Sequence, residues 1–142
     1  MVKDESKVFI DSDAFIGLND SSDALYKKAM LISQILLDHS AQLYTGTNVI
    51  SEVTTILSQR IGHSHAVSFL KMIRTSNITI LHPEPKLVME AEDIFAQQKS
   101  KNVSYADCVS FALMKKSGIE IAFSYDRDFK KNGFKLISEF LN

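Results

Sequence analysis

Five short β-rich runs alternate with longer helical stripes along this chain of 142 residues, and this alternation constrains the fold more than any other feature. The predicted strands are residues 7–10, 42–45, 78–81, 119–123 and 134–137. Helical periodicity covers residues 24–37, 47–62, 66–73, 83–95 and 104–116, with a turn or short helix at 126–131. Strands that alternate with helices are typical of a mostly parallel sheet covered on both faces, so we predict an α/β fold with a central five-stranded sheet.

Composition favours one globular domain over residues 1–142. Hydrophobic residues make up 45% of the chain and charged residues 23%, which excludes a disordered or collagen-like protein. Cys108 is the only cysteine, so a disulfide framework and a cysteine-based zinc site are excluded. No apolar stretch approaches the roughly 20 residues of a membrane span, and the N-terminus does not resemble a signal peptide. We therefore expect a soluble, cytoplasmic protein without membrane contact.

Four acidic residues from distant segments are predicted to meet at one edge of the sheet. Asp11 and Asp126 each follow a predicted strand, and ligand sites of parallel sheets form at the carboxyl ends of the strands. Glu52 lies early in the helix that follows the second strand. Asp107 lies in the first turn of a helix that a short connection joins to the fourth strand, so that helix runs antiparallel to the strand and begins at the same edge.

Carboxylates gathered in this way repel one another and raise each other's pKa unless a cation lies between them. Oxygen ligands without histidine or cysteine favour a hard divalent ion such as Mg²⁺ or Mn²⁺. A bound divalent ion lowers the pKa of a water molecule and neutralises charge that develops on a phosphate. The pattern therefore predicts a metal site suited to cleavage of phosphodiester bonds.

Each acid also has a purely structural interpretation. Asp11 fits a helix N-cap, and Asp107 fits a capping box with Ser104. Glu52 fits a solvated helix position, and Asp126 fits a charged turn. The order and placement of the whole set, and no single residue, favour the metal site.

The set resembles the PIN-domain ribonucleases, in particular the VapC-like toxin ribonucleases of type II toxin–antitoxin systems. The segment VFIDSDAFI supplies Asp11, TNVISEVTTIL supplies Glu52, VSYADCVSFALMKKSG supplies Asp107 and FSYDRDF supplies Asp126. The resemblance extends from about residue 7 to residue 138. Two positions depart from the family pattern, because Asp13 stands where Ser or Asn is common and Ser124 stands where Thr is usual.

The resemblance implies a three-layer α/β/α sandwich and a Mg²⁺- or Mn²⁺-dependent endoribonuclease. It also implies RNA as the substrate, a homodimer, and inhibition by a small antitoxin protein. By position, the antitoxin would lie in a groove formed by residues 13–39 and 47–75.

We assign roles to the matching residues on the same basis. Asp11, Asp107 and Asp126 are expected to hold the metal, and Glu52 to complete the catalytic set or orient the attacking water. The residues expected to support these four are Asp13, Ser124 and Asp128. Candidates for contact with the RNA backbone are the basic residues Arg60, Lys115, Arg127 and Lys130.

Three other functions compete with a toxin ribonuclease. One is an RNA-processing PIN nuclease outside toxin–antitoxin systems. Another is a haloacid-dehalogenase-like phosphatase, because FIDSDAF matches the DxD motif in which the first aspartate, here Asp11, forms a phospho-enzyme. The third is a non-catalytic interaction module with the same sheet architecture.

Overall fold

The computed structural model describes residues 2–141, and its strands form one five-stranded sheet in the order β3-β2-β1-β4-β5. The strands are β1 (Lys7–Ile10), β2 (Gln42–Gly46), β3 (Thr79–Leu81), β4 (Ile121–Phe123) and β5 (Lys135–Leu136). All four neighbouring pairs are parallel. The predicted mostly parallel sheet is thus confirmed, and it contains no antiparallel pair among these strands.

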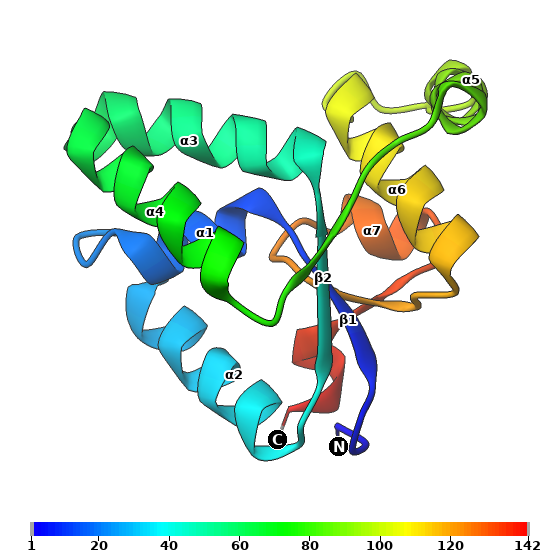
Figure 1. The fold of residues 1–142 in the computed structure, drawn as a ribbon. Coiled ribbons are helices and arrows are strands. Elements are labelled where there is room, and N and C mark those ends of the chain that lie inside the picture. The colour runs from blue at the N-terminus through cyan, green and yellow to red at the C-terminus, as the bar shows by residue number, and fades with distance from the viewer. Residues whose placement is uncertain (1, 142) are drawn as a thin grey trace.

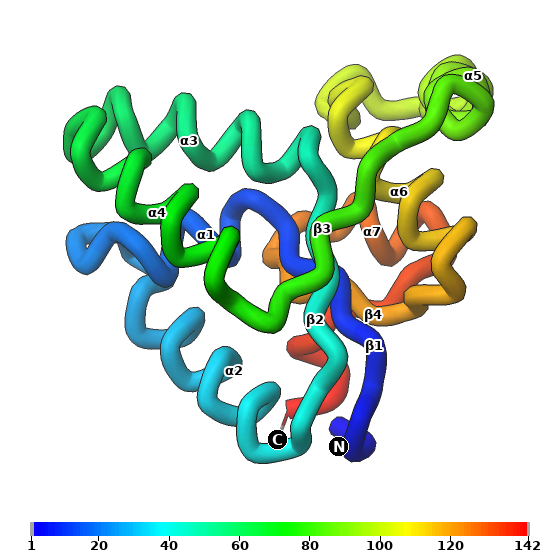
Figure 2. The backbone as a smooth tube through the Cα atoms, viewed as in Figure 1, coloured from blue at the N-terminus to red at the C-terminus, as the bar shows by residue number. Residues whose placement is uncertain are grey.

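Helices cover both faces of the sheet, as the three-layer prediction requires (Figure 1). They are α1 (Ser12–Asn19), α2 (Tyr26–Asp38), α3 (Thr47–Ile61), α4 (His63–Thr75), α5 (Pro85–Ala96), α6 (Tyr105–Ser117), α7 (Asp128–Lys131) and the 3₁₀ helix η1 (Ile137–Phe140). The backbone trace in Figure 2 shows α1 to α4 on one side of the strands and α5 to α7 on the other. None of the helices within residues 2–141 has the length and apolar character needed to cross a membrane.

The core lies between the sheet and the two helical layers. The central strand β1 is fully buried at Val8 and Phe9, as expected for a parallel strand covered on both faces. On the side of α6, Phe111 packs edge-on against Phe129 with 5.0 Å between the ring centroids. Both rings are fully buried, so this contact fixes α6 against α7.

Helix α1 was absent from the sequence-based assignment, and its burial explains why. Residues 14–17 are all buried, so the eight-residue helix has no polar face over this stretch and no helical alternation of hydrophobic and polar residues. Several predicted boundaries were also wrong. Helix α4 begins at His63, earlier than predicted, whereas α2 begins at Tyr26, α5 at Pro85 and the fourth strand at Ile121, each two residues later than predicted.

The junction between β2 and α3 is tightly packed and depends on Gly46. The backbone there is extended, with φ −119° and ψ 156°, which any residue can adopt. A Cβ atom added at Gly46 would lie 2.3 Å from Oδ1 of Asn48 and 2.7 Å from Cδ1 of Leu113. Glycine is therefore required by the close approach of α3 and α6, and its own dihedral angles do not require it.

Substituting Gly46→Ala should destabilise the protein by about 1–3 kcal/mol, because the methyl group overpacks this junction. The measurement is the midpoint of urea unfolding at equilibrium. A midpoint equal to that of the wild type would contradict the packing described for this junction.

Candidate active site

The carboxyl ends of β1 and β4 bring Asp11 next to Ser124. The two strands are neighbours, with Ile10 paired to Phe123, and the Asp11 N–H donates to the Phe123 carbonyl at 3.1 Å. Ser124 Oγ donates to Asp11 Oδ2 at 2.8 Å, and both side chains are buried. Asp11 occupies the N-cap position of α1, yet its side chain makes no capping hydrogen bond. The N-cap position predicted for Asp11 is therefore confirmed, but its carboxylate does not cap the helix.

Asp13, in the first turn of α1, faces the same two strand ends. Its Oδ2 accepts from the Tyr125 N–H at 2.8 Å and lies 3.3 Å from Ser124 Oγ. Its other oxygen, Oδ1, is buried and has no hydrogen-bond partner. Ser124 thus contacts Asp11 directly, and Asp13 lies beside the same hydroxyl group.

Asp126 and Asp128 lie in the turn that leads from β4 into α7. The Asp126 N–H donates to Ser124 Oγ at 3.1 Å, and the Asp128 N–H donates to Asp126 Oδ1 at 2.9 Å. The turn is therefore ordered by its own acidic side chains, and the charged-turn interpretation describes its local geometry correctly.

Asp107 is both a capping residue and a member of the acidic group. Its Oδ2 accepts from the Ser104 N–H at 3.0 Å, while its own N–H donates to Ser104 Oγ at 3.0 Å, which forms the predicted capping box. The charge of Asp107 also contributes to raising the pKa of Asp11 and of Asp128. We call Asp11, Asp13, Asp107, Asp126 and Asp128 the aspartate cluster.

Burial and mutual repulsion disfavour the charged state of this cluster. Burial, followed by the charge of Asp13, raises the pKa of Asp11 well above its usual value. Burial also raises the pKa of Asp13 to about 6, and the charge of Asp126 adds to this effect. The pKa of Asp107 is raised by burial and, more weakly, by Asp126. Charges this unfavourable are what a bound cation would stabilise.

Glu52 stands apart from these aspartates. It is exposed on α3, and its side chain makes no hydrogen bond or ion pair with any residue from 2 to 141. The structure therefore brings together three of the four predicted catalytic acids through their charges, with Asp13 and Asp128 added, and leaves Glu52 outside the hydrogen-bonded network.

The predicted RNA-contacting residues are dispersed. Arg60 pairs with Asp23 at 3.1 Å in the last turn of α3, and Lys130 pairs with Glu139 at 3.6 Å. Lys115 lies in the last turn of α6, about 12 Å along the helix axis from Asp107. Arg127 is exposed and is the only one of the four that adjoins the cluster in sequence.

The cluster matches a hard divalent cation in the chemistry of its donors. It offers only carboxylate oxygens, and the buried Asp13 Oδ1 has no partner within the protein. Within the described part of the chain, however, no group of three or more His, Cys, Asp or Glu side chains could hold a metal ion as it stands. The donor set fits such an ion, and binding would require the carboxylates to draw closer together.

Two residues near the cluster were not identified from the sequence. Tyr125 supplies the N–H that binds Asp13, and its own hydroxyl is buried without a partner. Burial, together with the charge of Asp13, raises the pKa of Tyr125 to about 12. Asn48 joins α3 to α6 beside Asp107. Tyr125 contacts Asp13 through a backbone N–H that nearly any residue would supply, and the amide of Asn48 does not titrate, so only the fold could identify them.

Substituting Asp13→Asn should stabilise the metal-free protein at pH 7.5 by about 1–3 kcal/mol and have much less effect near pH 4. The pKa of Asp13 is about 6 in the folded state and 3.8 ordinarily, so folded wild-type protein loses stability as the pH rises from about 4 to 6. An amide does not titrate and escapes this loss. Thermal unfolding in EDTA at both pH values measures the difference.

The exposed residue Asp93 provides the matched control, because Asp93→Asn changes the same chemical group outside the cluster. It should leave the melting temperature nearly unchanged at both pH values. An Asp13→Asn effect that is the same at pH 4 and pH 7.5 would contradict the burial of a destabilised carboxylate at this position.

Comparison with known proteins gives a consistent family assignment. The PIN domain family matches residues 8–135. The 23S rRNA-specific endonuclease VapC20 of Mycobacterium tuberculosis is 27% identical over 127 residues, which cover 89% of this chain and 95% of that protein. Ribonuclease VapC1 of Aquifex aeolicus is 28% identical over 124 residues, covering 87% of this chain and 83% of VapC1.

Solved structures agree with the sequence relatives. The crystal structure of M. tuberculosis VapC20, described as a Sarcin-Ricin loop cleaving toxin, has a TM-score of 0.79 at 26% identity and covers 89% of this chain and 95% of its own. VapBC2 of Rickettsia felis has a TM-score of 0.67 at 13% identity, covers 92% of this chain and 96% of its own, and supports the fold alone. The predicted resemblance is confirmed, and the chain belongs to the PIN-domain family, with similarity to its VapC ribonucleases.

Proposed function

We propose that this protein is a divalent-metal-dependent endoribonuclease that hydrolyses RNA phosphodiester bonds and serves as the toxin of a toxin–antitoxin pair. The observation that carries the proposal is the aspartate cluster at the carboxyl edge of a PIN-family sheet. There, burial and repulsion from neighbouring carboxylates destabilise the charged form of Asp11. VapC20 and VapC1, which are named as an endonuclease and a ribonuclease, support the same activity.

In this proposal Asp11, Asp107 and Asp126 would hold Mg²⁺ or Mn²⁺, and the ion would lower the pKa of a water molecule and neutralise charge on the phosphate. Ser124 holds Asp11 in place through its 2.8 Å hydrogen bond. Asp13 adds negative charge beside Asp11, and its buried Oδ1, which has no partner among the described residues, is available to accept a hydrogen bond.

Glu52 is proposed to orient the attacking water once RNA is bound, which agrees with its exposure on α3. Arg127 is the strongest of the four basic candidates for phosphate contact, because it lies between Asp126 and Asp128 and is exposed. Lys115, Lys130 and Arg60 remain candidates farther along the surface.

Ribosomal RNA is the first substrate to test, because VapC20 acts on 23S rRNA according to its name. A haloacid-dehalogenase-like phosphatase is not supported, since the family match covers the PIN domain from residue 8 to residue 135 and includes Asp11. A non-catalytic module is also disfavoured, because such a protein gains nothing from the repulsion at Asp11.

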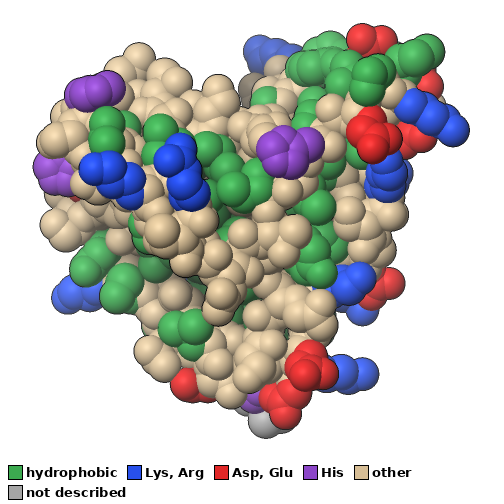
Figure 3. All heavy atoms as spheres, viewed as in Figure 1, with side chains coloured by type: hydrophobic (Ala, Val, Ile, Leu, Met, Phe, Trp, Pro, Cys, Tyr) green, Lys and Arg blue, Asp and Glu red, His purple; other side chains and the backbone are tan. Residues whose placement is uncertain are grey.

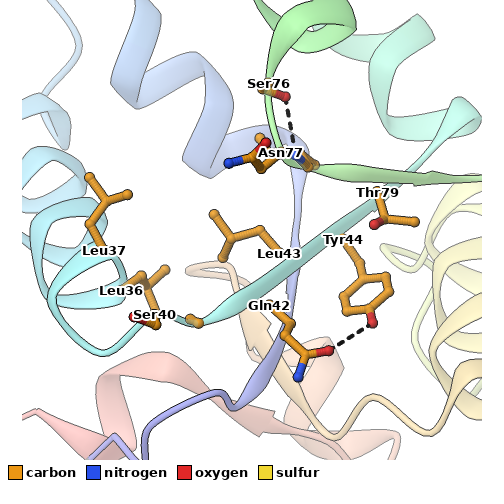
Figure 4. A pocket seen from close by; sticks show the side chains of 11 residues that line it. Leu36, Leu37, Ser40, Gln42, Leu43, Tyr44, Ser76, Asn77 and Thr79 are labelled. Atoms are coloured by element: carbon orange, nitrogen blue, oxygen red, sulfur yellow. Dashed lines mark hydrogen bonds between the residues drawn. The ribbon is translucent and has the colours of Figure 1, made fainter.

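The proposed antitoxin site is an apolar surface on α2 and α4, which is separate from the aspartate cluster. A groove of about 660 Å³ lies at the opposite, amino edge of β2 and β3 (Figure 4). It continues into a smaller groove between α1, α2 and α4, since both are lined by Leu36, Leu43 and Ile78. Figure 3 shows hydrophobic side chains at the surface over α2 and α4.

The exposed apolar side chains that line these grooves suit an apolar segment of a partner protein. Leu37 on α2 lines the larger groove and is 64% exposed, and Met72 on α4 lines the smaller groove and is 41% exposed. The small antitoxin is the occupant that the proposed function implies. The homodimer and the cytoplasmic location expected from the sequence stay predictions.

Substituting Asp11→Asn or Asp107→Asn separately should lower Mn²⁺-dependent cleavage of a 23S rRNA loop fragment by at least about 100-fold, because each removes a proposed metal ligand. Asp93→Asn, on exposed α5, is the matched control and should cleave like the wild type. EDTA should abolish cleavage and added Mn²⁺ should restore it. Wild-type cleavage by either cluster variant would refute the metal assignment.

Substituting Leu37→Asp should abolish association with the antitoxin, because it places a charge in the wall of the larger apolar groove, and should leave RNA cleavage unchanged. Met89→Asp is a matched control, since Met89 on α5 is also 64% exposed but lies on the other side of the sheet. Co-purification with the product of the adjacent reading frame measures association. Loss of binding in both variants, or in neither, would argue against this surface.

A further inference from the structure

Asn48, the second residue of α3, bridges α3 to the turn of α6 that carries Asp107. Its Nδ2 donates to the Ala106 carbonyl at 3.0 Å and to Ser110 Oγ at 2.9 Å. These acceptors lie one helical turn apart and flank Asp107 in the sequence. Across residues 2–141 they are the only side-chain hydrogen bonds between α3 and α6. The amide therefore fixes both the rotation and the height of this turn relative to α3.

Asn48 joins the two helices through its Nδ2 donor alone, because its Oδ1 makes no hydrogen bond to a described residue. Asn48 Oδ1 is buried without a partner, which destabilises a folded protein. It packs against Gly46, where even a Cβ atom would lie 2.3 Å away. Reversing the amide would place two oxygens together at the Ala106 carbonyl, so this acceptor determines the orientation.

Both proposed catalytic groups on these helices depend on the bridge. Asp107 directly follows Ala106, and its Oδ2 is already bound by Ser104, which leaves Oδ1 without a hydrogen bond to any described residue. Glu52 lies four residues after Asn48 and therefore on the same face of α3. The face that contacts α6 is thus also the face that carries Glu52.

We infer that Asn48 is a positioning residue of the nuclease site, which fixes the Asp107 turn of α6 relative to the Glu52 face of α3. This inference rests on the proposed function. Asn48 touches neither substrate nor metal and acts through the two carboxylates.

The test compares Asn48→Leu with the wild type by titrating Mn²⁺ into RNA-free protein and measuring binding by electron paramagnetic resonance. Leucine keeps the volume of the side chain and removes the donor. We expect Mn²⁺ affinity to fall by about 10-fold or more, the range seen when groups that orient metal ligands are lost. At saturating Mn²⁺, kcat for RNA cleavage should fall while KM for RNA stays near the wild-type value.

Asn19→Leu separates positioning from general loss of stability. Asn19 Nδ2 donates to the Phe15 carbonyl at 2.7 Å, so this variant also breaks a bond from an asparagine amide to a helix carbonyl, but in α1. It should lower the melting temperature without changing Mn²⁺ affinity. Equal weakening of Mn²⁺ binding in both leucine variants would overturn the inference, as would wild-type affinity in folded Asn48→Leu.

Ser110→Ala provides a second, milder variant should Asn48→Leu fail to fold. It removes one of the two acceptors and keeps the bond to Ala106, so Mn²⁺ affinity should fall by a smaller factor in the same direction. Unchanged affinity in Ser110→Ala would then overturn the inference. Failure of the wild-type protein itself to bind Mn²⁺ is a different result, because it would refute the proposed function.

Discussion

The parallel pairing of β1 with β4 is the constraint on which the candidate site depends. It ends both strands at one edge and forces the Asp11 carboxylate against the turn at residues 124–128. The Ser124 hydroxyl and the Tyr125 N–H offset part of the resulting repulsion, and burial increases the rest. The fold thus retains a cluster of carboxylates that its own hydrogen bonds only partly stabilise, which is the condition under which a divalent cation contributes most to stability.

The sequence was sufficient to predict the position of those site residues that directly follow a strand. Asp11 and Asp126 could be assigned to one edge because each follows a strand and parallel strands end at the same edge of the sheet. The pairing of β1 with β4 then places the two residues side by side. Helix α1 could not be predicted, because burial on all sides leaves no helical period to detect. Asn48 could not be predicted either, since its role depends on an acceptor 58 positions later in the chain. The position of Glu52 in the sequence likewise did not determine how far its side chain is exposed, because that depends on how α3 packs in the fold.

Chemistry and partner binding occupy opposite edges of the same sheet in this proposal. The carboxyl end of β2 leads through Gly46 into the helix that faces the aspartate cluster, whereas its amino end, at Gln42 and Leu43, lines the apolar groove. One short strand therefore connects the two regions. An inhibitor bound at the groove would contact β2, the strand that positions α3. It could therefore affect the aspartate cluster through β2 without covering it.

The ends of the strand order have a consequence for self-association. The outer strands are short, with three residues in β3 and two in β5, and η1 follows β5 directly. Little unpaired backbone is available there as a template for another chain, so growth by edge-to-edge strand addition is disfavoured. Contacts between copies are then expected to use helix surfaces, and cross-β growth of a fibril from these strand edges is disfavoured.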